Sequence, residues 1–296
     1  MTAGSARLRS MLFVPGDSER KFVKAASIGA DALILDLEDA VAPSMKAAAR
    51  GQVAALIDDP SPRHWAFYVR VNPFDTGLTL ADLAAVVRPG LDGIVLPKAN
   101  GAHDLERLGH YLDAFETAAG MSAGAVKVVV VATETAQAMF QLGSYAPAHP
   151  RLAALTWGGE DLSAAIGAVS PRHEDGAWTE PYRHVRSWCL FAAAAAGVAP
   201  LETLWADYRD GEGLAADSRA ARRDGFTGRI AIHPDQIAII NECFSPSEAD
   251  VAHARRVVAA FAAQPDAGTI GIDGKMYDRP HLTAAEKTLA AAGELG

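Results

Sequence analysis

The chain has 296 residues, of which 50% are hydrophobic, and a formal net charge of −9 at pH 7. This length suits one α/β barrel or two smaller domains, and the negative charge argues against general affinity for DNA or RNA. No segment approaches the about 20 consecutive apolar residues that span a membrane, and the apolar run before Pro15 is too short for a secretory signal. Cys189 and Cys243 have no metal-binding or disulfide-framework spacing, so we expect a cytoplasmic protein with ordinary thiols.

Short β-rich segments alternate with helical patterns along the chain. The expected strands are residues 11–14, 32–37, 66–71, 93–97, 126–131, 152–157, 201–205 and 229–233. Alanine-rich helical spacing marks residues 44–57, 102–118 and 181–196 between them, the last ending at a glycine cap, Gly197. Eight β-α repeats predict a TIM (β/α)₈ barrel, a fold of about 250 residues. We therefore expect a barrel domain over residues 1–263 and a C-terminal extension over residues 264–296.

Polar residues follow the carboxyl ends of most of these expected strands. They are Asp36 and Glu38, Arg70 and Asn72, Lys98, Glu134, Asp161 and His233. A charge inside a buried strand costs several kcal/mol, whereas a charge at the strand's end escapes that cost. Active sites of TIM barrels are built at this carboxyl face from the ends of several strands. We therefore expect these side chains to converge on one site.

Glu134 and Asp161 are the expected metal ligands. Two carboxylates with few competing ligands suit a hard, oxygen-preferring cation such as Mg²⁺, which keeps positions for water and substrate. The glycines at 158 and 159 would let the backbone come close to a ligand. Glu160 is an alternative to Asp161, because spacing alone does not separate them. The structural alternative is that these acids cap a helix or lie in its first turn.

The segment LDLEDAV offers further acids close to a buried arginine. Asp36 and Glu38 share one side of their strand, where carboxylates either hold metal-bound waters or form a salt bridge. Arg70 lies in an apolar strand and needs an anionic partner. It would stabilise a developing oxyanion on a bound substrate, or form a structural ion pair with Asp36 or Glu38.

A basic group follows the VPGD turn near the start of the chain. Arg20, Lys21 and Lys24 open the first expected helix and are candidates for holding phosphate. The alternative, that these three residues only form a solvent-exposed face of the helix, is equally consistent with the sequence. His233, at the same face of the barrel, is expected to be structural.

Eight motifs then occur in order over nearly the whole chain. They are RSMLFVPGD, ALILDLEDAVAP, YVRVN, GIVLPKA, ETAQA, WGGEDL, GFTGRIAIHPDQI and DGKMYDRPHL. Together they resemble the citrate lyase β-subunit-like enzymes, which include citryl-CoA, malyl-CoA and citramalyl-CoA lyases. The resemblance implies a TIM barrel, one Mg²⁺, and reversible Claisen-type cleavage of a 3-hydroxyacyl-CoA into an acyl-CoA such as acetyl-CoA and an α-keto acid.

The resemblance also implies roles for individual residues. It puts the metal ligands on Glu134 and Asp161, the oxyanion-stabilising arginine on Arg70, and the acids that hold metal waters on Glu38 and Asp39. The CoA phosphates would then fall to Arg20, Lys21 and Lys24.

The tail motif GKMYDRP adds an acid/base aspartate, which falls on Asp278. In CoA-dependent members of the family this tail reaches the active site of a neighbouring subunit, usually within a trimer. The resemblance therefore implies a homo-oligomer, and the motif favours a CoA-using lyase over relatives that lack the tail.

Other functions remain open at this stage. A barrel with Mg²⁺, Glu, Asp and Arg also serves CoA-independent class II pyruvate aldolases, and a second alternative is a β-subunit of a multi-subunit citrate lyase that acts on an acyl-carrier-protein thioester. A barrel used purely as a binding scaffold is disfavoured by the many charges at the carboxyl face. Substrate identity depends on one methyl or carboxyl group, for which residues 170–179, with Arg172, His173 and Trp178, form a candidate wall.

Overall fold

A computed structural model describes residues 7–174 and 176–294 of the chain. These residues form two compact units, the first ending at Asn241 and the second beginning at Glu242. The boundary expected from the sequence, between residues 263 and 264, falls inside the second unit. None of the helices in the described ranges has the length and apolar character needed to cross a bilayer.

The first unit contains a closed barrel of eight parallel strands, as the sequence predicts. They are β1 (Ser10–Pro15), β2 (Ala32–Asp36), β3 (Ala66–Arg70), β4 (Gly93–Leu96), β5 (Lys127–Val131), β6 (Leu152–Thr156), β7 (Ala199–Glu202) and β8 (Gly228–Ala231). Their order in the barrel follows the chain, and β8 pairs with β1 to close it. The β7 strand begins two residues earlier than expected, because Pro200 is accommodated near the start of a strand.

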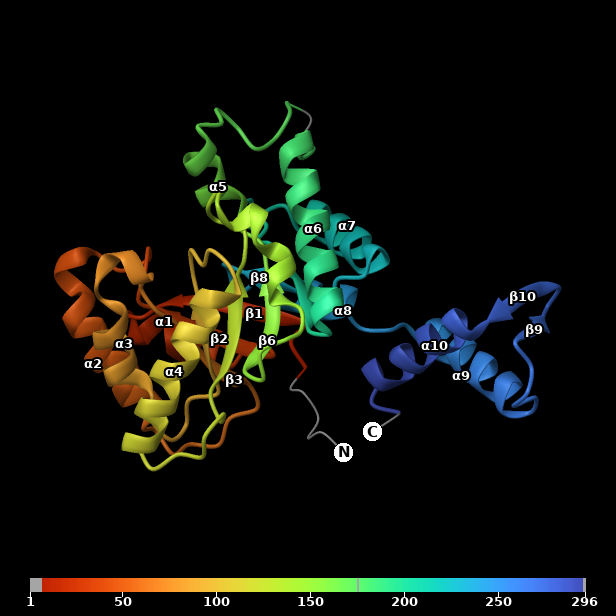
Figure 1. Ribbon diagram of the computed structural model, residues 1–296, viewed down its shortest axis with the longest axis horizontal. Coiled ribbons are helices and arrows are strands. Elements are labelled where there is room, and N and C mark those ends of the chain that lie inside the picture. The colour runs from red at the N-terminus through yellow and green to blue at the C-terminus, as the bar shows by residue number, and fades with distance from the viewer. Residues whose placement is uncertain (1–6, 175, 295–296) are drawn as a thin grey trace. The chain divides into compact units, whose positions relative to one another are not determined.

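Helices surround these strands on the outside of the barrel (Figure 1). They are α1 (Glu19–Ala25), α2 (Lys46–Ile57), α3 (Thr79–Val86), α4 (Ala102–Ala118), α5 (Gly159–Ile166), α6 (Glu180–Ala196), α7 (Gly211–Asp224) and α8 (Gln236–Cys243), with 3₁₀ turns η1 (Pro43–Met45), η2 (Phe74–Thr76), η3 (Ala138–Phe140) and η4 (Leu142–Tyr145). After β5 the chain forms only η3 and η4 before it enters β6. The predicted cap at Gly197 is confirmed, since this residue is left-handed with φ 69°.

The barrel interior is filled by one face of each strand. Its buried members include Met11, Ile34, Tyr68, Val95, Val129, Ala154, Leu201 and Ile230. Side chains alternate along a strand, so the interior face of β2 continues to Asp36 and that of β3 to Arg70. These two residues are partners in the register of the two strands. The fold therefore brings an acid and a base together at the carboxyl end of the barrel.

The second unit contains α9 (Glu248–Ala262), the hairpin of β9 (Thr269–Ile272) and β10 (Lys275–Asp278), and α10 (Arg279–Ala291). The hairpin turns at Asp273 and Gly274, which both have positive φ angles, as a two-residue type I′ turn requires. Its core is formed by buried side chains such as Val257, Phe261 and Leu289. The DGKMYDRP motif thus makes the hairpin turn, β10 and the start of α10.

Candidate active site

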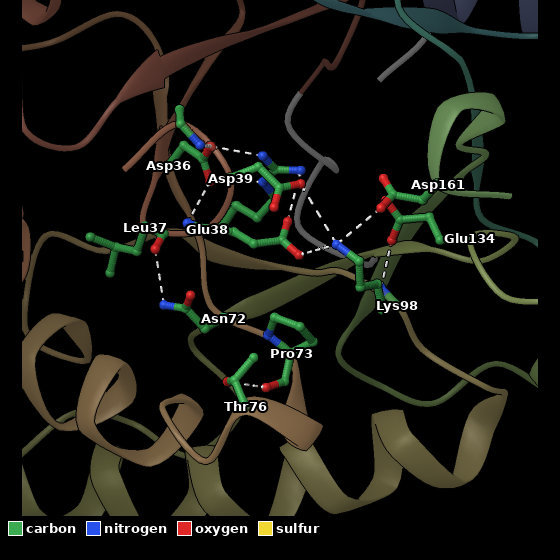
Figure 2. Close-up of polar contacts among 12 residues, drawn as sticks. Asp36, Leu37, Glu38, Asp39, Asn72, Pro73, Thr76, Lys98, Glu134 and Asp161 are labelled. Carbon is green, nitrogen blue, oxygen red and sulfur yellow. Dashed lines mark hydrogen bonds and ion pairs between the residues drawn. The ribbon is translucent and has the colours of Figure 1, made fainter. Parts of the chain in front are cut away.

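Charged side chains from four strand ends meet at the carboxyl face of the barrel. Figure 2 shows the Lys98 ammonium group between Glu38 on one side and the neighbouring carboxylates of Glu134 and Asp161 on the other. Asp39 extends the acidic group on the Glu38 side, where its Oδ2 lies 3.6 Å from Lys98 Nζ. The convergence expected from the strand ends is thus observed for Glu38, Lys98, Glu134 and Asp161.

Arg70 is held by two carboxylates of the LEDA segment. Its Nε and Nη2 donate to the two oxygens of Asp36 at 2.8 and 2.7 Å, and its Nη1 lies 2.9 Å from Glu38 Oε2. That Glu38 oxygen is buried and accepts no hydrogen bond from the described residues. Burial opposes the charge on Arg70, but the bonds to Asp36 and the charge of Glu38 raise its pKa above the usual value. The structural ion pair therefore exists and keeps the guanidinium charged.

Lys98 links the acids of β2 to those of β5 and β6. Its Nζ donates to Glu38 Oε1 at 2.6 Å and lies 3.2 Å from Asp161 Oδ1. Its backbone is left-handed, with φ 50°, a conformation that costs a non-glycine residue about 1 kcal/mol or more. In this conformation its backbone N–H donates to Glu134 Oε2 at 2.5 Å. One strained residue thus contacts four carboxylates of the site, including that of Asp39.

Glu134 is the most deeply buried of the expected metal ligands, with 4% of its surface exposed. Burial raises its pKa to about 8, and the negative charges of Asp161 and Glu38 act in the same direction against the hydrogen bond from Lys98. Burial also raises the pKa of Glu38, against the opposing effects of Arg70 and Lys98. Glu134 precedes η3 and does not cap it, so the helix-cap alternative does not account for this acid.

Asp161 lies in the first turn of α5, as the structural alternative supposed, but caps no N–H there. Its carboxylate instead contacts Lys98, whereas Glu160, the other candidate, is exposed and makes no such contact in the described chain. The geometry therefore favours Asp161 over Glu160 as the partner of Glu134.

The residues of this site fit a hard divalent cation. Five carboxylates, those of Asp36, Glu38, Asp39, Glu134 and Asp161, lie around the cationic side chains of Arg70 and Lys98. Within residues 7–174 and 176–294, no three His, Cys, Asp or Glu side chains form a metal-binding cluster. A pair of carboxylates, Glu134 and Asp161, would therefore supply two oxygen ligands. The other coordination positions would be left to water and substrate, an arrangement that suits Mg²⁺.

Gly158 provides the space that Glu134 occupies. A Cβ atom added at Gly158 would lie 2.8 Å from Glu134 Cγ and 3.3 Å from its Oε1. Gly158 therefore allows the backbone to lie close to the Glu134 side chain, whereas an added Cβ at Gly159 would lie 3.3 Å from the Trp178 ring.

Among the cavities that adjoin the site, two share a lining residue. The first, the acidic cavity, has a volume of about 90 Å³ and is lined by Arg70, Glu134, Asp161 and Arg172 among others. The second, the basic cavity, has about 540 Å³ and is lined by Arg20, Lys21, Lys24 and His233 among others. Phe13 lines both cavities, so they are neighbours. The three basic residues picked out from the sequence therefore share one cavity.

His233 and Asn72 have structural contacts. The ring of His233 stacks on Tyr208 at 4.4 Å, and Asn72 Nδ2 donates to the carbonyl of Leu37 at 2.9 Å. The expectation that His233 is structural agrees with its stacking, although it also lines the basic cavity.

Asp278 belongs to the second unit. It is the last residue of β10, immediately before α10. Its Oδ1 lies 2.5 Å from His281 Nδ1, which donates to it when that nitrogen is protonated. The carboxylate is 38% exposed, so it is accessible to a reacting group.

Sequence reasoning gave no role to Lys98 or Thr156. The signal for Lys98 was present, because it follows β4 as the other site residues follow their strands. Thr156, the last residue of β6, lines the acidic cavity with a buried hydroxyl that has no hydrogen-bond partner in the described part of the chain. The sequence did not single out Thr156, because it ends an otherwise apolar strand.

A closed (β/α)₈ barrel with this acidic, arginine-containing site defines a class of barrel enzymes that work at the strands' carboxyl ends. The chain belongs to the HpcH/HpaI aldolase/citrate lyase family, whose profile matches residues 9–234. The resemblance to citrate lyase β-like proteins is therefore confirmed.

Curated relatives match over almost the full length of the chain. The citrate lyase subunit beta-like protein of Mycobacterium tuberculosis is 38% identical over 284 residues, 96% of this chain and 95% of its own. A (3S)-malyl-CoA thioesterase of Cereibacter sphaeroides is 36% identical over 293 residues, 96% of this chain and 94% of its own. A crystal structure of the Mycobacterium tuberculosis protein CitE contains magnesium, acetoacetate and coenzyme A; it is 36% identical, with a TM-score of 0.78, and the match covers 98% of this chain and 100% of that one.

Proposed function

We propose that the chain is a Mg²⁺-dependent carbon–carbon lyase. Its substrate is a 3-hydroxyacyl-CoA of the citramalyl-CoA, malyl-CoA or citryl-CoA type, cleaved into an acyl-CoA such as acetyl-CoA and an α-keto acid. The observation that supports this most is the pair of cavities that share Phe13. A small acidic cavity suits the reacting end of the substrate, and a larger basic one suits a phosphate-bearing carrier.

Glu134 and Asp161 would hold the cation, and Glu38 and Asp39 would hold its waters. The bound Mg²⁺ would supply Lewis-acid polarisation of the substrate's oxygen atoms. Lys98 keeps its charge here, because its bond to Glu38 and the surrounding carboxylates raise its pKa against the effect of burial. It therefore orients Glu38 and Asp161 and does not act as a base.

Arg70 would stabilise the enolate that forms when the carbon–carbon bond breaks. Its Nη1 is the one guanidinium nitrogen that does not donate to Asp36, and the described residues offer it only the ion pair with Glu38. The group lines the acidic cavity beside Phe13, whose ring centre is 4.6 Å from its Cζ. A preorganised donor of this kind contributes about 3 kcal/mol to the transition state.

The remaining residues of the site would bind the CoA carrier and transfer the proton. Arg20, Lys21 and Lys24 would bind the phosphates of CoA in the basic cavity. Asp278 would transfer the proton to or from the enolate carbon, from a neighbouring subunit of a homotrimer. His281 would orient the Asp278 carboxylate for that transfer.

A thioesterase is the second candidate, because one relative at 36% identity is a malyl-CoA thioesterase. The two reactions differ in their products. A lyase releases a keto acid and keeps the thioester on CoA, whereas a thioesterase adds water and releases free CoA with the intact hydroxy acid.

The test is to incubate the protein and Mg²⁺ with the three thioesters in parallel. Keto acid is trapped as its phenylhydrazone, and free CoA is measured with a thiol reagent. We expect keto acid without stoichiometric thiol, lost on adding EDTA and in a Glu134→Ala variant, and retained in an exposed control, Glu106→Gln. Thiol release without keto acid would establish the thioesterase instead. If none of the three thioesters yields keto acid or free thiol, both candidates are wrong, and the enzyme depends on a carrier protein or acts without CoA.

A further inference from the structure

The acidic cavity has a second arginine in its wall, Arg172, from the loop between α5 and α6. Its backbone forms an isolated antiparallel bridge with Trp178. Its guanidinium carbon lies 3.5 Å from the centre of the Trp178 ring and 5.3 Å from that of Trp205. Stacking on a ring occupies the face of a guanidinium and leaves the N–H groups at its edge free to bind a carboxylate.

The ring under Arg172 is itself fixed. Trp178 packs edge-on against Trp157 at 4.9 Å and in a tilted arrangement against Tyr182 at 6.0 Å. Trp157 Nε1 donates to Glu202 Oε1 at 2.6 Å, and Tyr182 shares a 2.7 Å hydrogen bond with Ser163. Arg172 is therefore held in place by contacts on the barrel side, as a preorganised binding residue needs to be.

The guanidinium lacks an anionic partner within residues 7–174 and 176–294. Its observed hydrogen bond runs from Nη1 to the carbonyl of Gly176 at 2.7 Å, and no described carboxylate lies within ion-pair distance. Burial lowers its pKa, which means that desolvation outweighs the more distant acids such as Glu160. By contrast, Arg70 in the same cavity is paired with Asp36 and Glu38.

A second unpartnered group lines the same cavity. The hydroxyl of Thr156 is buried and has no hydrogen-bond partner among the described residues. The cavity therefore offers a cation and a hydroxyl that its own acids do not satisfy. A volume of about 90 Å³ admits only a few heavy atoms, so the missing partner is small.

We propose that Arg172 determines specificity by binding a carboxylate on the side chain of the substrate's hydroxyl-bearing carbon. This rests on the proposed lyase function. The preferred substrate then carries a carboxymethyl group at that carbon, as citryl-CoA does, and the keto acid released is a dicarboxylate. Citramalyl-CoA has a methyl group and malyl-CoA a hydrogen at the same position, so the three thioesters differ only at the group that Arg172 would contact.

The kinetic test compares kcat/KM of wild type, Arg172→Met, Arg172→Lys and Arg183→Met on the three thioesters. Arg183 is an exposed arginine of α6 and serves as the matched control. Loss of a charge-assisted bond predicts an about 10- to 100-fold drop for Arg172→Met on citryl-CoA and little change on the other two. Arg172→Lys keeps the charge but not the planar fork, so it should recover only part of the loss.

A binding test separates this inference from the lyase proposal. Calorimetric titration with freshly prepared oxaloacetate and with pyruvate, in the presence of Mg²⁺, needs no turnover. We expect wild type to prefer oxaloacetate and Arg172→Met to lose that preference, with an unchanged melting temperature as the folding control. If wild type cleaves no thioester, the lyase proposal fails and the titration alone decides the role of Arg172. Equal losses on all three thioesters, or no oxaloacetate preference to lose, would overturn the inference.

Discussion

Replacing Glu134 with glutamine should make the metal-free protein more stable at high pH. The wild-type pKa of about 8, against a usual value of 4.5, corresponds to about 5 kcal/mol at 1.36 kcal/mol per pKa unit. The folded state thus retains a proton that the unfolded chain has already lost. The unfolding free energy therefore falls as pH rises from 4.5 and levels off above 8.

Glutamine has the same shape as a protonated glutamate but does not titrate. Between about pH 5.5 and about pH 8.5 the wild type should lose about 3 kcal/mol relative to Glu134→Gln. Added Mg²⁺ should make the wild type more stable than Glu134→Gln, because the metal binds the deprotonated carboxylate and offsets the cost of burying its charge. Binding should accordingly release a proton and tighten as pH rises towards 8.

The assay is urea unfolding of wild type, Glu134→Gln and the exposed control Glu106→Gln at both pH values, with EDTA or with Mg²⁺. Calorimetry in two buffers of different ionisation enthalpy measures the proton released on binding. If the difference between wild type and Glu134→Gln is the same at both pH values, Glu134 is already ionised in the metal-free fold and the reasoning is wrong.

Three further predictions concern the other parts of the site. Arg70→Met should lower lyase kcat/KM by about 10²- to 10³-fold and destabilise the fold by about 3–5 kcal/mol, because it leaves buried carboxylates unpaired, whereas Arg70→Lys should restore stability but not rate. Gly158→Ala puts a Cβ 2.8 Å from Glu134 Cγ and should weaken Mg²⁺ binding by about tenfold in calorimetry, while Gly51→Ala, with nothing within 4 Å, should not. Asp278→Asn should cut turnover by about 10²- to 10⁴-fold with Mg²⁺ binding unchanged, and mixing it with inactive Glu134→Gln should restore activity if the aspartate acts in a neighbouring subunit.

The barrel was predictable because its strands are buried on both faces. Such strands read as short apolar runs, and all eight were recognised, from Ser10–Pro15 to Gly228–Ala231. Only β7 was displaced, because Pro200 is tolerated at a strand start that periodicity does not reveal. The start of the second unit at Glu242 has no comparable signal, because it falls within the helix α8, Gln236–Cys243.

The site was predictable where register alone brings residues together. Asp36 and Arg70 are register partners on adjacent strands, so their ion pair follows from alternation once the strands are placed. Lys98 is different, because its role depends on a left-handed backbone that sequence does not specify at a lysine. Its hydrogen bond to Glu38 joins residues sixty positions apart, and no local sequence pattern predicts a contact over that separation.

The energetics of the site link the strand-end pattern to the need for a cation. Buried parallel strands drive their polar residues to one face, and here five carboxylates gather around Arg70 and Lys98 at that face. Arg70 and Lys98 satisfy the acids of β2, which leaves Glu134 with a raised pKa and Asp161 beside it. A fold that concentrates negative charge in this way is destabilised at neutral pH unless a cation neutralises it. The same apolar runs that predict the barrel therefore also predict where a divalent metal would stabilise it.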